Sequence, residues 1–144
     1  MKLVSLSDLS IFARDVLKRL PMETTRATVV ILVGELGAGK TTFMQALASV
    51  LGVVDTVQSP TYVLMKSYPI SYNQFTKLVH IDAYRLNNAE EFEALKPEQF
   101  FNDPHALVCI EWPERVGSAL PEAHIVLKFS SENAGEKERY ISVG

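Results

Sequence analysis

The sequence predicts an α/β protein in which helices cover both faces of a single mixed β-sheet. Three observations predict this class. Continuous apolar runs at residues 27–33 and 105–112 are typical of strands that are buried on both faces. Segments with apolar residues at helical spacing alternate with such runs along the chain. Two pairs of strand-like segments are joined by short polar connections, and such hairpins add antiparallel strands to the sheet.

The first part of the chain is expected to contain two helices around one buried strand. Residues 7–20 carry apolar side chains at helical spacing, with Ser7 as the expected N-cap. Residues 27–33 are continuous and β-branched, which favours a central strand. A second helix is predicted at residues 41–51, where Gly52 provides a C-terminal stop.

The rest of the chain is dominated by strands. They are predicted at residues 57–70, 76–86, 105–112, 123–130 and 138–143. The first two and the last two of these strands form the expected hairpins. A short helix is predicted at residues 87–95, with Asn88 and Glu91 spaced as a capping pair. Residues 113–120 fit one or two helical turns.

Composition and charge limit the possible functions. The chain has 144 residues, with 47% hydrophobic and 22% charged residues, which fits one globular domain. Its net charge of -3 provides no basic footprint, so we expect no stable DNA binding and no tight, direct tRNA binding. The sequence shows neither a signal core nor an apolar run near the ~20 residues of a membrane span, which favours a cytoplasmic protein. The single cysteine, Cys109, is expected in the core.

Residues 29–42, VVILVGELGAGKTT, carry the clearest functional motif. The pattern G-x-x-x-x-G-K-[ST] is satisfied by Gly34, Gly39, Lys40 and Thr41, and Gly37 adds a third glycine. Glycines let backbone N–H groups surround phosphate oxygens, Lys40 supplies a positive charge, and Thr41 can coordinate Mg²⁺. A glycine-rich turn without a ligand is the alternative, but the strand before and the helix after favour nucleotide binding. We therefore predict a P-loop NTPase fold.

Two carboxylates are candidates for the chemistry beside this loop. A magnesium-dependent hydrolase needs an acid at the end of a neighbouring strand, to hold the metal or to orient the attacking water. Asp82 follows the apolar run LVHI, and Glu111 follows LVCI. Thr61, in SPTY, is a third candidate, although by itself it is more typical of a turn residue. His80 lies on an apolar strand and is more typical of a structural histidine than a catalytic one.

The motifs GELGAGKTT, SPTY, HIDAYRL and IEWPER, in this order and spacing, resemble the bacterial TsaE (YjeE) family. Members of that family are the ATPase component of tRNA N6-threonylcarbamoyladenosine synthesis. The resemblance runs from the first helix to the terminal hairpin, which is nearly the whole chain. The phosphate loop occurs in many families, whereas the other three motifs are much more specific.

The resemblance implies roles for individual residues. The nucleotide would be bound by Glu35, Leu36, Gly37, Ala38, Gly39, Lys40, Thr41, Thr42, Thr61 and Trp112. Asp82, Lys40 and Glu111 would be catalytic, with Asp82 as the acid needed for turnover. Thr41 and Glu111 would hold Mg²⁺. Trp112 also fits a half-buried core aromatic, and Arg85 could either stabilise transition-state charge or hold a partner.

The resemblance also implies an activity and partners. Residues 1–144 would form a single P-loop ATPase domain that binds and hydrolyses ATP with Mg²⁺. It would support the TsaB–TsaD complex, in which TsaD transfers a threonylcarbamoyl group to adenosine 37 of tRNAs that read ANN codons. The chain would meet tRNA only through that complex, and its hydrolysis would be slow alone and stimulated by partners. ATP is favoured over GTP because the sequence lacks an N-K-x-D-type element.

Two other functions are compatible with the phosphate loop. A small-molecule kinase has similar glycine spacing, but it usually needs a lid with several arginines, and the six arginines here are scattered. A phosphorylated product formed without TsaB and TsaD would favour the kinase. A nucleotide-dependent switch would act by binding alone, and it would still support tRNA modification after Asp82→Ala.

Overall fold

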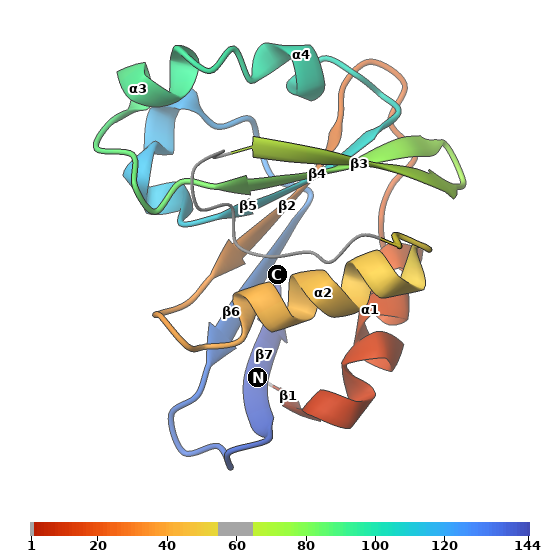
Figure 1. Cartoon of the computed structure of the whole chain (residues 1–144), viewed down its shortest axis with the longest axis vertical. Helices are drawn as coiled ribbons and strands as arrows, with labels where there is room; N and C mark the ends of the chain where they lie inside the picture. The colour runs from red at the N-terminus through yellow and green to blue at the C-terminus, as the bar shows by residue number, and fades with distance from the viewer. Residues whose placement is uncertain (1, 55–64) are drawn as a thin grey trace.

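The computed structural model describes residues 2–54 and 65–144, which form one seven-stranded sheet with helices (Figure 1). The strands are β1 (Lys2–Ser5), β2 (Thr28–Val33), β3 (Met65–Tyr72), β4 (Phe75–Asp82), β5 (Ala106–Glu111), β6 (Ile125–Ser130) and β7 (Glu138–Val143). The α-helices are α1 (Leu9–Lys18), α2 (Lys40–Val50), α3 (Ala89–Glu93) and α4 (Glu98–Phe101). Three 3₁₀ turns are η1 (Leu6–Asp8), η2 (Pro113–Arg115) and η3 (Gly117–Ala119).

The sheet is mixed, as the two hairpins predict. Its strand order is β1-β7-β6-β2-β5-β4-β3. Four consecutive strands, β6, β2, β5 and β4, run parallel to one another, whereas β3, β7 and β1 are antiparallel to their neighbours. Because β2, β4 and β5 end at the same edge, the segments that follow them meet there.

Helices cover both faces of this sheet, which confirms the predicted α/β class. On one face, α1 and α2 pack Phe12 and Phe43 against strand residues such as Leu32. On the other face, α3, α4 and the η2–η3 segment pack Phe92 and Val116 against β2, β4 and β5. Figure 1 shows α1 and α2 on one side of the sheet and α3 and α4 on the other. The site therefore rests on strands that are held from both sides.

Several local predictions are confirmed. The Asn88 side chain accepts a hydrogen bond from the Glu91 backbone N–H at 2.9 Å, so the predicted cap of α3 is present. Cys109 is completely buried, and this burial raises the pKa of its thiol to about 12. The alternating strand β6 buries Ile125, Leu127 and Phe129 on one face.

Other boundaries differ from the prediction. Ser7 is not the N-cap of α1, because a 3₁₀ turn precedes the helix and Asp8 occupies the cap position. Strand β4 ends at Asp82 because residues 83–86 form a turn, closed by a hydrogen bond from Leu86 N–H to the Ala83 carbonyl. Neither β1 nor α4 is predicted by the sequence pattern. None of the helices in the described part of the chain combines the length and hydrophobicity that crossing a bilayer requires.

Candidate functional site

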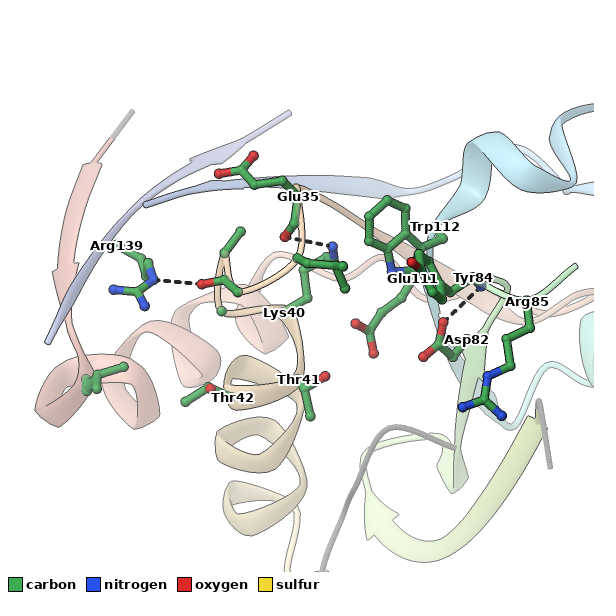
Figure 2. A pocket seen from close by; sticks show the side chains of 15 residues that line it. Glu35, Lys40, Thr41, Thr42, Asp82, Tyr84, Arg85, Glu111, Trp112 and Arg139 are labelled. Atoms are coloured by element: carbon green, nitrogen blue, oxygen red, sulfur yellow. Dashed lines mark hydrogen bonds between the residues drawn. The ribbon is translucent and has the colours of Figure 1, made fainter. Parts of the chain in front are cut away.

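A pocket of about 350 Å³ opens at the edge where β2, β4 and β5 end (Figure 2). Its lining comes from the loop between β2 and α2, the first turn of α2, the ends of β4 and β5, η1 and β7. The lining residues are Leu6, Glu35, Leu36, Gly37, Ala38, Gly39, Lys40, Thr41, Thr42, Asp82, Tyr84, Arg85, Glu111, Trp112 and Arg139. All the site residues expected from the sequence are thus brought together except Thr61, which lies outside the described residues.

The glycine-rich loop (residues 34–39) needs glycine for two separate reasons. A Cβ at Gly34 would lie 2.7 Å from the Phe129 carbonyl oxygen, so a side chain there would push the loop away from β6. Gly39 has a φ of 105°, a left-handed conformation that side chains rarely adopt, and it forms the N-cap of α2. The sequence therefore forces a tight turn that brings the start of α2 close to the end of β2.

Lys40 is a cation buried among acceptors. Only 5% of the residue is exposed, and its ammonium group donates hydrogen bonds to the Gly34 and Glu35 carbonyls. The ammonium nitrogen also lies 3.9 Å from the centre of the Trp112 ring. Burial lowers the pKa of Lys40, and the negative charge of Glu111 opposes this shift. The loop thus holds a partly desolvated positive charge in the wall of the pocket.

Two carboxylates converge on the same side of the pocket. Asp82 and Glu111 end the neighbouring parallel strands β4 and β5 and are register partners. Burial raises the pKa of Asp82, and the charge of Glu111 raises it further, against a hydrogen bond from the Tyr84 backbone N–H. In Figure 2 both carboxyl groups point toward the space beside Thr41. Acids of unlike environment beside a cation are a frequent arrangement in catalytic sites.

Glu111 is the more buried of the two acids. It is 2% exposed, and its Oε2 lies 2.5 Å from Nε2 of His80, a residue with no exposed surface. The side chain of Asp82, in contrast, has its one hydrogen bond among the described residues from the main chain. Glu111 is therefore fixed by another side chain, and Asp82 is fixed by the turn that follows it.

Trp112 closes the pocket next to Glu111. Its φ of 60° is left-handed, which is uncommon for a bulky residue and turns the chain sharply out of β5 into η2. The Tyr84 ring packs against the Trp112 ring with centroids 4.9 Å apart. Arg115 lies 5.3 Å from the Tyr84 ring. Trp112 thus lines the pocket and is also half-buried against the core, so its position agrees with both interpretations.

Two lining residues were missed by the sequence analysis. Leu6 belongs to η1, and Arg139 belongs to β7, far along the chain from the glycine-rich loop. The Arg139 guanidinium donates to the Gly37 carbonyl at 3.3 Å and is also held by main-chain carbonyls of its own hairpin. Neither residue sits in a recognisable motif. Only the pairing of β1 and β7 with the sheet brings them to the loop.

A divalent metal would find few protein ligands here. Within residues 2–54 and 65–144, no group of three or more His, Cys, Asp or Glu side chains is arranged to hold a metal ion. The oxygen-bearing side chains that line the pocket include those of Thr41, Glu111 and Asp82 (Figure 2). Mg²⁺ is commonly bound by one or two carboxylates together with substrate phosphates. The donor set therefore fits Mg²⁺ that arrives with a phosphorylated substrate.

Comparison with known proteins assigns a family. The family described as "Threonylcarbamoyl adenosine biosynthesis protein TsaE" matches residues 5–141. The tRNA threonylcarbamoyladenosine biosynthesis protein TsaE of Haemophilus influenzae is 38% identical, over 82% of this chain and 70% of that protein. Its namesake in Streptomyces coelicolor is 34% identical, over 90% of this chain and 88% of that protein.

A solved structure extends the similarity to the fold. The crystal structure of YdiB from Bacillus subtilis superposes with a TM-score of 0.67 and 27% identity, covering 99% of this chain and 84% of that chain. The matched family segment contains all three strand ends and the whole glycine-rich loop described above. The chain therefore belongs to the TsaE family of threonylcarbamoyladenosine biosynthesis proteins.

Proposed function

We propose that this chain is a P-loop ATPase that binds and hydrolyses ATP with Mg²⁺ to support the TsaB–TsaD complex. That complex would carry out N6-threonylcarbamoylation of adenosine 37 in tRNAs that read ANN codons. One observation carries the proposal: the buried cation Lys40 ends a glycine-rich loop and faces two carboxylates from neighbouring strands. Membership of the TsaE family supports the biosynthetic context.

The loop and the first turn of α2 would hold the triphosphate. The first turn of helix α2 lines the pocket, and the positive end of the helix dipole there and the loop amides attract anionic oxygens. Lys40 now donates to two loop carbonyls, and phosphate oxygens are stronger acceptors for the same ammonium group. Glu35, Leu36, Gly37, Ala38 and Thr42 would complete the walls, together with Trp112 on the far side.

The pocket also fits a magnesium ion. Thr41 and Glu111 would be its protein ligands, since a hydroxyl and a carboxylate leave room for phosphate oxygens and water. When bound, Mg²⁺ would neutralise charge on the β- and γ-phosphates. The rest of the site supplies a positive charge at Lys40, which lies against the Trp112 ring, and the Tyr84 ring packs on Trp112 in turn.

Asp82 would act on the attacking water. Hydrolysis needs a water molecule directed at the γ-phosphorus, and it yields ADP, phosphate and a proton. A carboxylate whose pKa is raised is a better proton acceptor than a solvated one, and burial raises the pKa of Asp82. We therefore assign Asp82 to orient the water and receive its proton. Hydrolysis is expected to be slow in the isolated chain and faster with TsaB and TsaD.

The test is Lys40→Met, which keeps the length of the side chain and removes its charge. Calorimetry with ATP and Mg²⁺ should show a loss of affinity of about 100-fold or more, because the buried ammonium group has no substitute in the loop. Lys128→Met is the matched control, since Lys128 is exposed on β6 and does not line the pocket. In a second assay, TsaB and TsaD modify tRNA over many turnovers in the presence of either protein. The proposal is rejected if Lys40→Met supports this modification as well as the wild type does.

The same reconstitution separates the other two functions. A nucleotide switch would still support tRNA modification when Asp82→Asn binds ATP without hydrolysing it, whereas an energy-coupled ATPase would not. A small-molecule kinase would consume ATP and accumulate a phosphorylated product without TsaB and TsaD. Product analysis by phosphorus NMR distinguishes that product from inorganic phosphate.

A further inference from the structure

A third polar side chain lies directly beneath the two acids. His80 precedes Asp82 by two residues on β4, so both side chains point to the same face of the sheet. Its register partner on β5 is Cys109, which lies two residues before Glu111 on that strand. His80 is completely buried, whereas Asp82 and Glu111 line the pocket. A strand of this kind normally places an apolar residue at such a position.

The imidazole makes one directed contact. Nε2 of His80 lies 2.5 Å from Oε2 of Glu111, and Nε2 donates because an ionised carboxylate can only accept. The other ring nitrogen, Nδ1, has no hydrogen-bond partner among the described residues. Neither ring nitrogen reaches the pocket, because the residue has no exposed surface. The histidine can therefore act on a ligand only through Glu111.

We propose that His80 is a positioning residue that fixes the Glu111 carboxylate in the orientation needed to bind Mg²⁺. The inference rests on the proposed function, since it assigns a role toward the metal of the ATPase site. Oε2 is occupied by the histidine, and among the described residues Oε1 has no hydrogen-bond partner, which leaves it for the metal. A glutamate has three rotatable bonds, and the hydrogen bond from a buried ring removes that freedom before the metal arrives.

A purely structural pair would behave differently. A buried histidine–glutamate contact does little for stability compared with apolar residues of similar volume. If His80 served only to fill the core, its replacement would affect folding and all ligands alike. If it orients Glu111, its replacement would affect the metal and leave nucleotide binding without metal unchanged. The two roles therefore differ in the magnesium dependence of ATP binding.

The test compares three substitutions. His80→Gln keeps an N–H donor near the position of Nε2, His80→Asn has a donor too short to reach Glu111, and His80→Leu has none. Calorimetry measures ATP affinity in EDTA and at a series of Mg²⁺ concentrations. For His80→Leu and His80→Asn, the half-saturating Mg²⁺ concentration should rise about 10-fold, while the affinity in EDTA stays within about twofold. His80→Gln should recover most of the wild-type magnesium dependence.

Two controls make the result specific. In a Glu111→Gln background, His80→Asn should cause no further change in magnesium dependence, because the carboxylate that it orients is gone. His124→Leu, which removes the other, part-buried histidine–glutamate contact, should leave magnesium dependence unaltered. If His80→Leu does not fold, the Asn and Gln variants still provide the comparison, with thermal melting as the folding check.

The outcomes separate this inference from the proposed function. Equal loss of ATP affinity with and without Mg²⁺, or no change in either, would overturn the role of His80 while the wild type still bound Mg²⁺ and ATP together. A failure of His80→Gln to differ from His80→Asn would overturn it as well. If the wild-type chain bound ATP no better with Mg²⁺ than with EDTA, the ATPase site itself would be rejected, and the role of His80 with it.

Discussion

Two histidine–glutamate contacts of the same length hold opposite ends of the parallel strands. His80 and Glu111 lie under the pocket at the carboxyl ends, and His124 and Glu23 lie near the amino ends of β2 and β6. In both pairs Nε2 is 2.5 Å from a glutamate oxygen. The pairs differ in what else surrounds each group.

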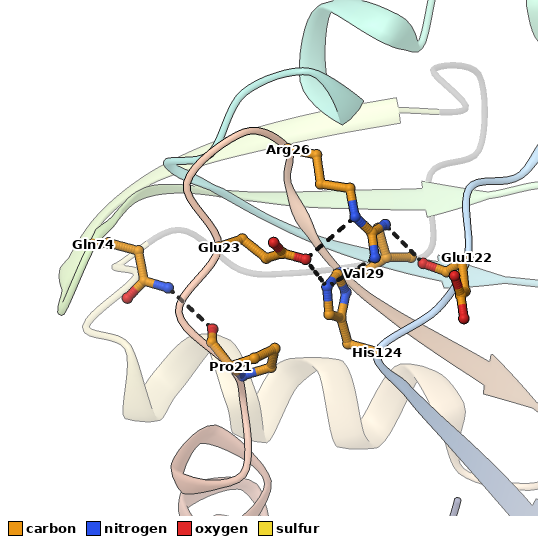
Figure 3. A network of polar contacts seen from close by, with 7 residues as sticks. All are labelled: Pro21, Glu23, Arg26, Val29, Gln74, Glu122 and His124. Carbon is orange, nitrogen blue, oxygen red and sulfur yellow. Dashed lines mark hydrogen bonds and ion pairs between the residues drawn. The ribbon is translucent and has the colours of Figure 1, made fainter.

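The second pair belongs to a closed network. Nδ1 of His124 accepts the backbone N–H of Val29 at 3.0 Å, so the ring hydrogen lies on Nε2, which donates to Glu23 (Figure 3). Arg26 cannot donate to that same nitrogen, and it is held instead by Glu23 at 3.3 Å and by the Glu122 carbonyl. Both ring nitrogens of His124 therefore have partners, and the bond from the Val29 N–H to the His124 ring adds a side-chain link between β2 and the start of β6.

The contrast indicates how similar contacts acquire different uses. At the amino ends, the carboxylate has a cation beside it and both ring nitrogens have partners, which is the pattern of a structural clamp. At the carboxyl ends, Nδ1 of His80 has no partner among the described residues and Glu111 faces the pocket. A polar cluster next to a pocket can bind a ligand when one of its hydrogen-bonding groups has no partner in the protein. A cluster whose groups bond to one another serves to stabilise the fold.

The largest expected effect is a loss of ATP turnover when the Asp82 carboxylate is replaced by an amide, and the same replacement at Glu23 provides the comparison. Asp82→Asn should lower ATP turnover by about 10²–10⁴-fold, because the group that would receive the proton is lost, while ATP affinity changes by less than about threefold. Glu23→Gln, the matched change in the network, should leave turnover within about twofold. Steady-state phosphate release and calorimetry measure the two quantities. Equal losses of turnover from both variants would erase the distinction between the two ends.

A second prediction concerns the histidine of the network. His124→Leu leaves the N–H of Val29 unpaired in a residue that is only 1% exposed. The free energy of unfolding should fall by about 1–3 kcal/mol, and Tm by roughly 3–10 °C. Denaturant unfolding and thermal melting measure these changes. Turnover of the folded variant should equal that of the wild type, so a His124→Leu protein with unaltered Tm but impaired turnover would show that the network is no clamp.

The acids at the two ends should also give opposite pH dependence of stability. The His124 hydrogen bond lowers the pKa of Glu23 below its ordinary value of 4.5, so its stabilisation is present above that pH and is lost as pH falls through the folded pKa. Burial raises the pKa of Asp82 above 3.8, so ionisation of Asp82 destabilises the folded chain at neutral pH. This destabilisation is relieved as pH falls from the folded pKa toward 3.8.

These signs can be read from melting curves in EDTA without nucleotide. At about pH 7, Glu23→Gln should lower Tm and Asp82→Asn should raise it. As the pH falls below the folded pKa of Glu23 and below the ordinary value of 3.8 for Asp82, both differences should shrink toward zero. An Asp82→Asn protein that melts below the wild type at neutral pH would mean that Asp82 is a structural acid, like Glu23.

Local patterns in the sequence predicted most of the fold. The apolar runs identified β2 and β5, alternation identified β6 and β7, and the Asn88–Glu91 spacing identified the start of α3. The edge strand β1 was missed because its four residues show no period and gain their partners only from the far end of the chain. The N-cap of α1 was misplaced because the 3₁₀ turn at Leu6–Asp8 is fixed by a hydrogen bond from Leu6 to Lys137.

The candidate site divides in the same way. Lys40 could be predicted from the G-x-x-x-x-G-K-[ST] motif. Asp82 and Glu111 could be predicted because each follows a strong strand pattern, and parallel strands bring their carboxyl ends together. Arg139 could not, because its approach to the glycine-rich loop depends on the pairing of β7 with β6. The contact of His80 with Glu111 requires both the register of β4 on β5 and the direction of two side chains, and neither is encoded in a local motif.

The smallest effect is expected at Arg26. Its ion pair with Glu23 joins side chains that are 31% and 25% exposed, so Arg26→Met should cost only about 0.2–1 kcal/mol of unfolding free energy. Part of this loss should disappear in about 1 M salt, where screening is strong. Denaturant unfolding at low and high salt, with Arg26→Met alone and combined with Glu23→Gln, isolates the pair. A salt-independent loss as large as that of His124→Leu would mean that Arg26, rather than the histidine, holds Glu23, and the likeness between the two histidine–glutamate contacts would then be accidental.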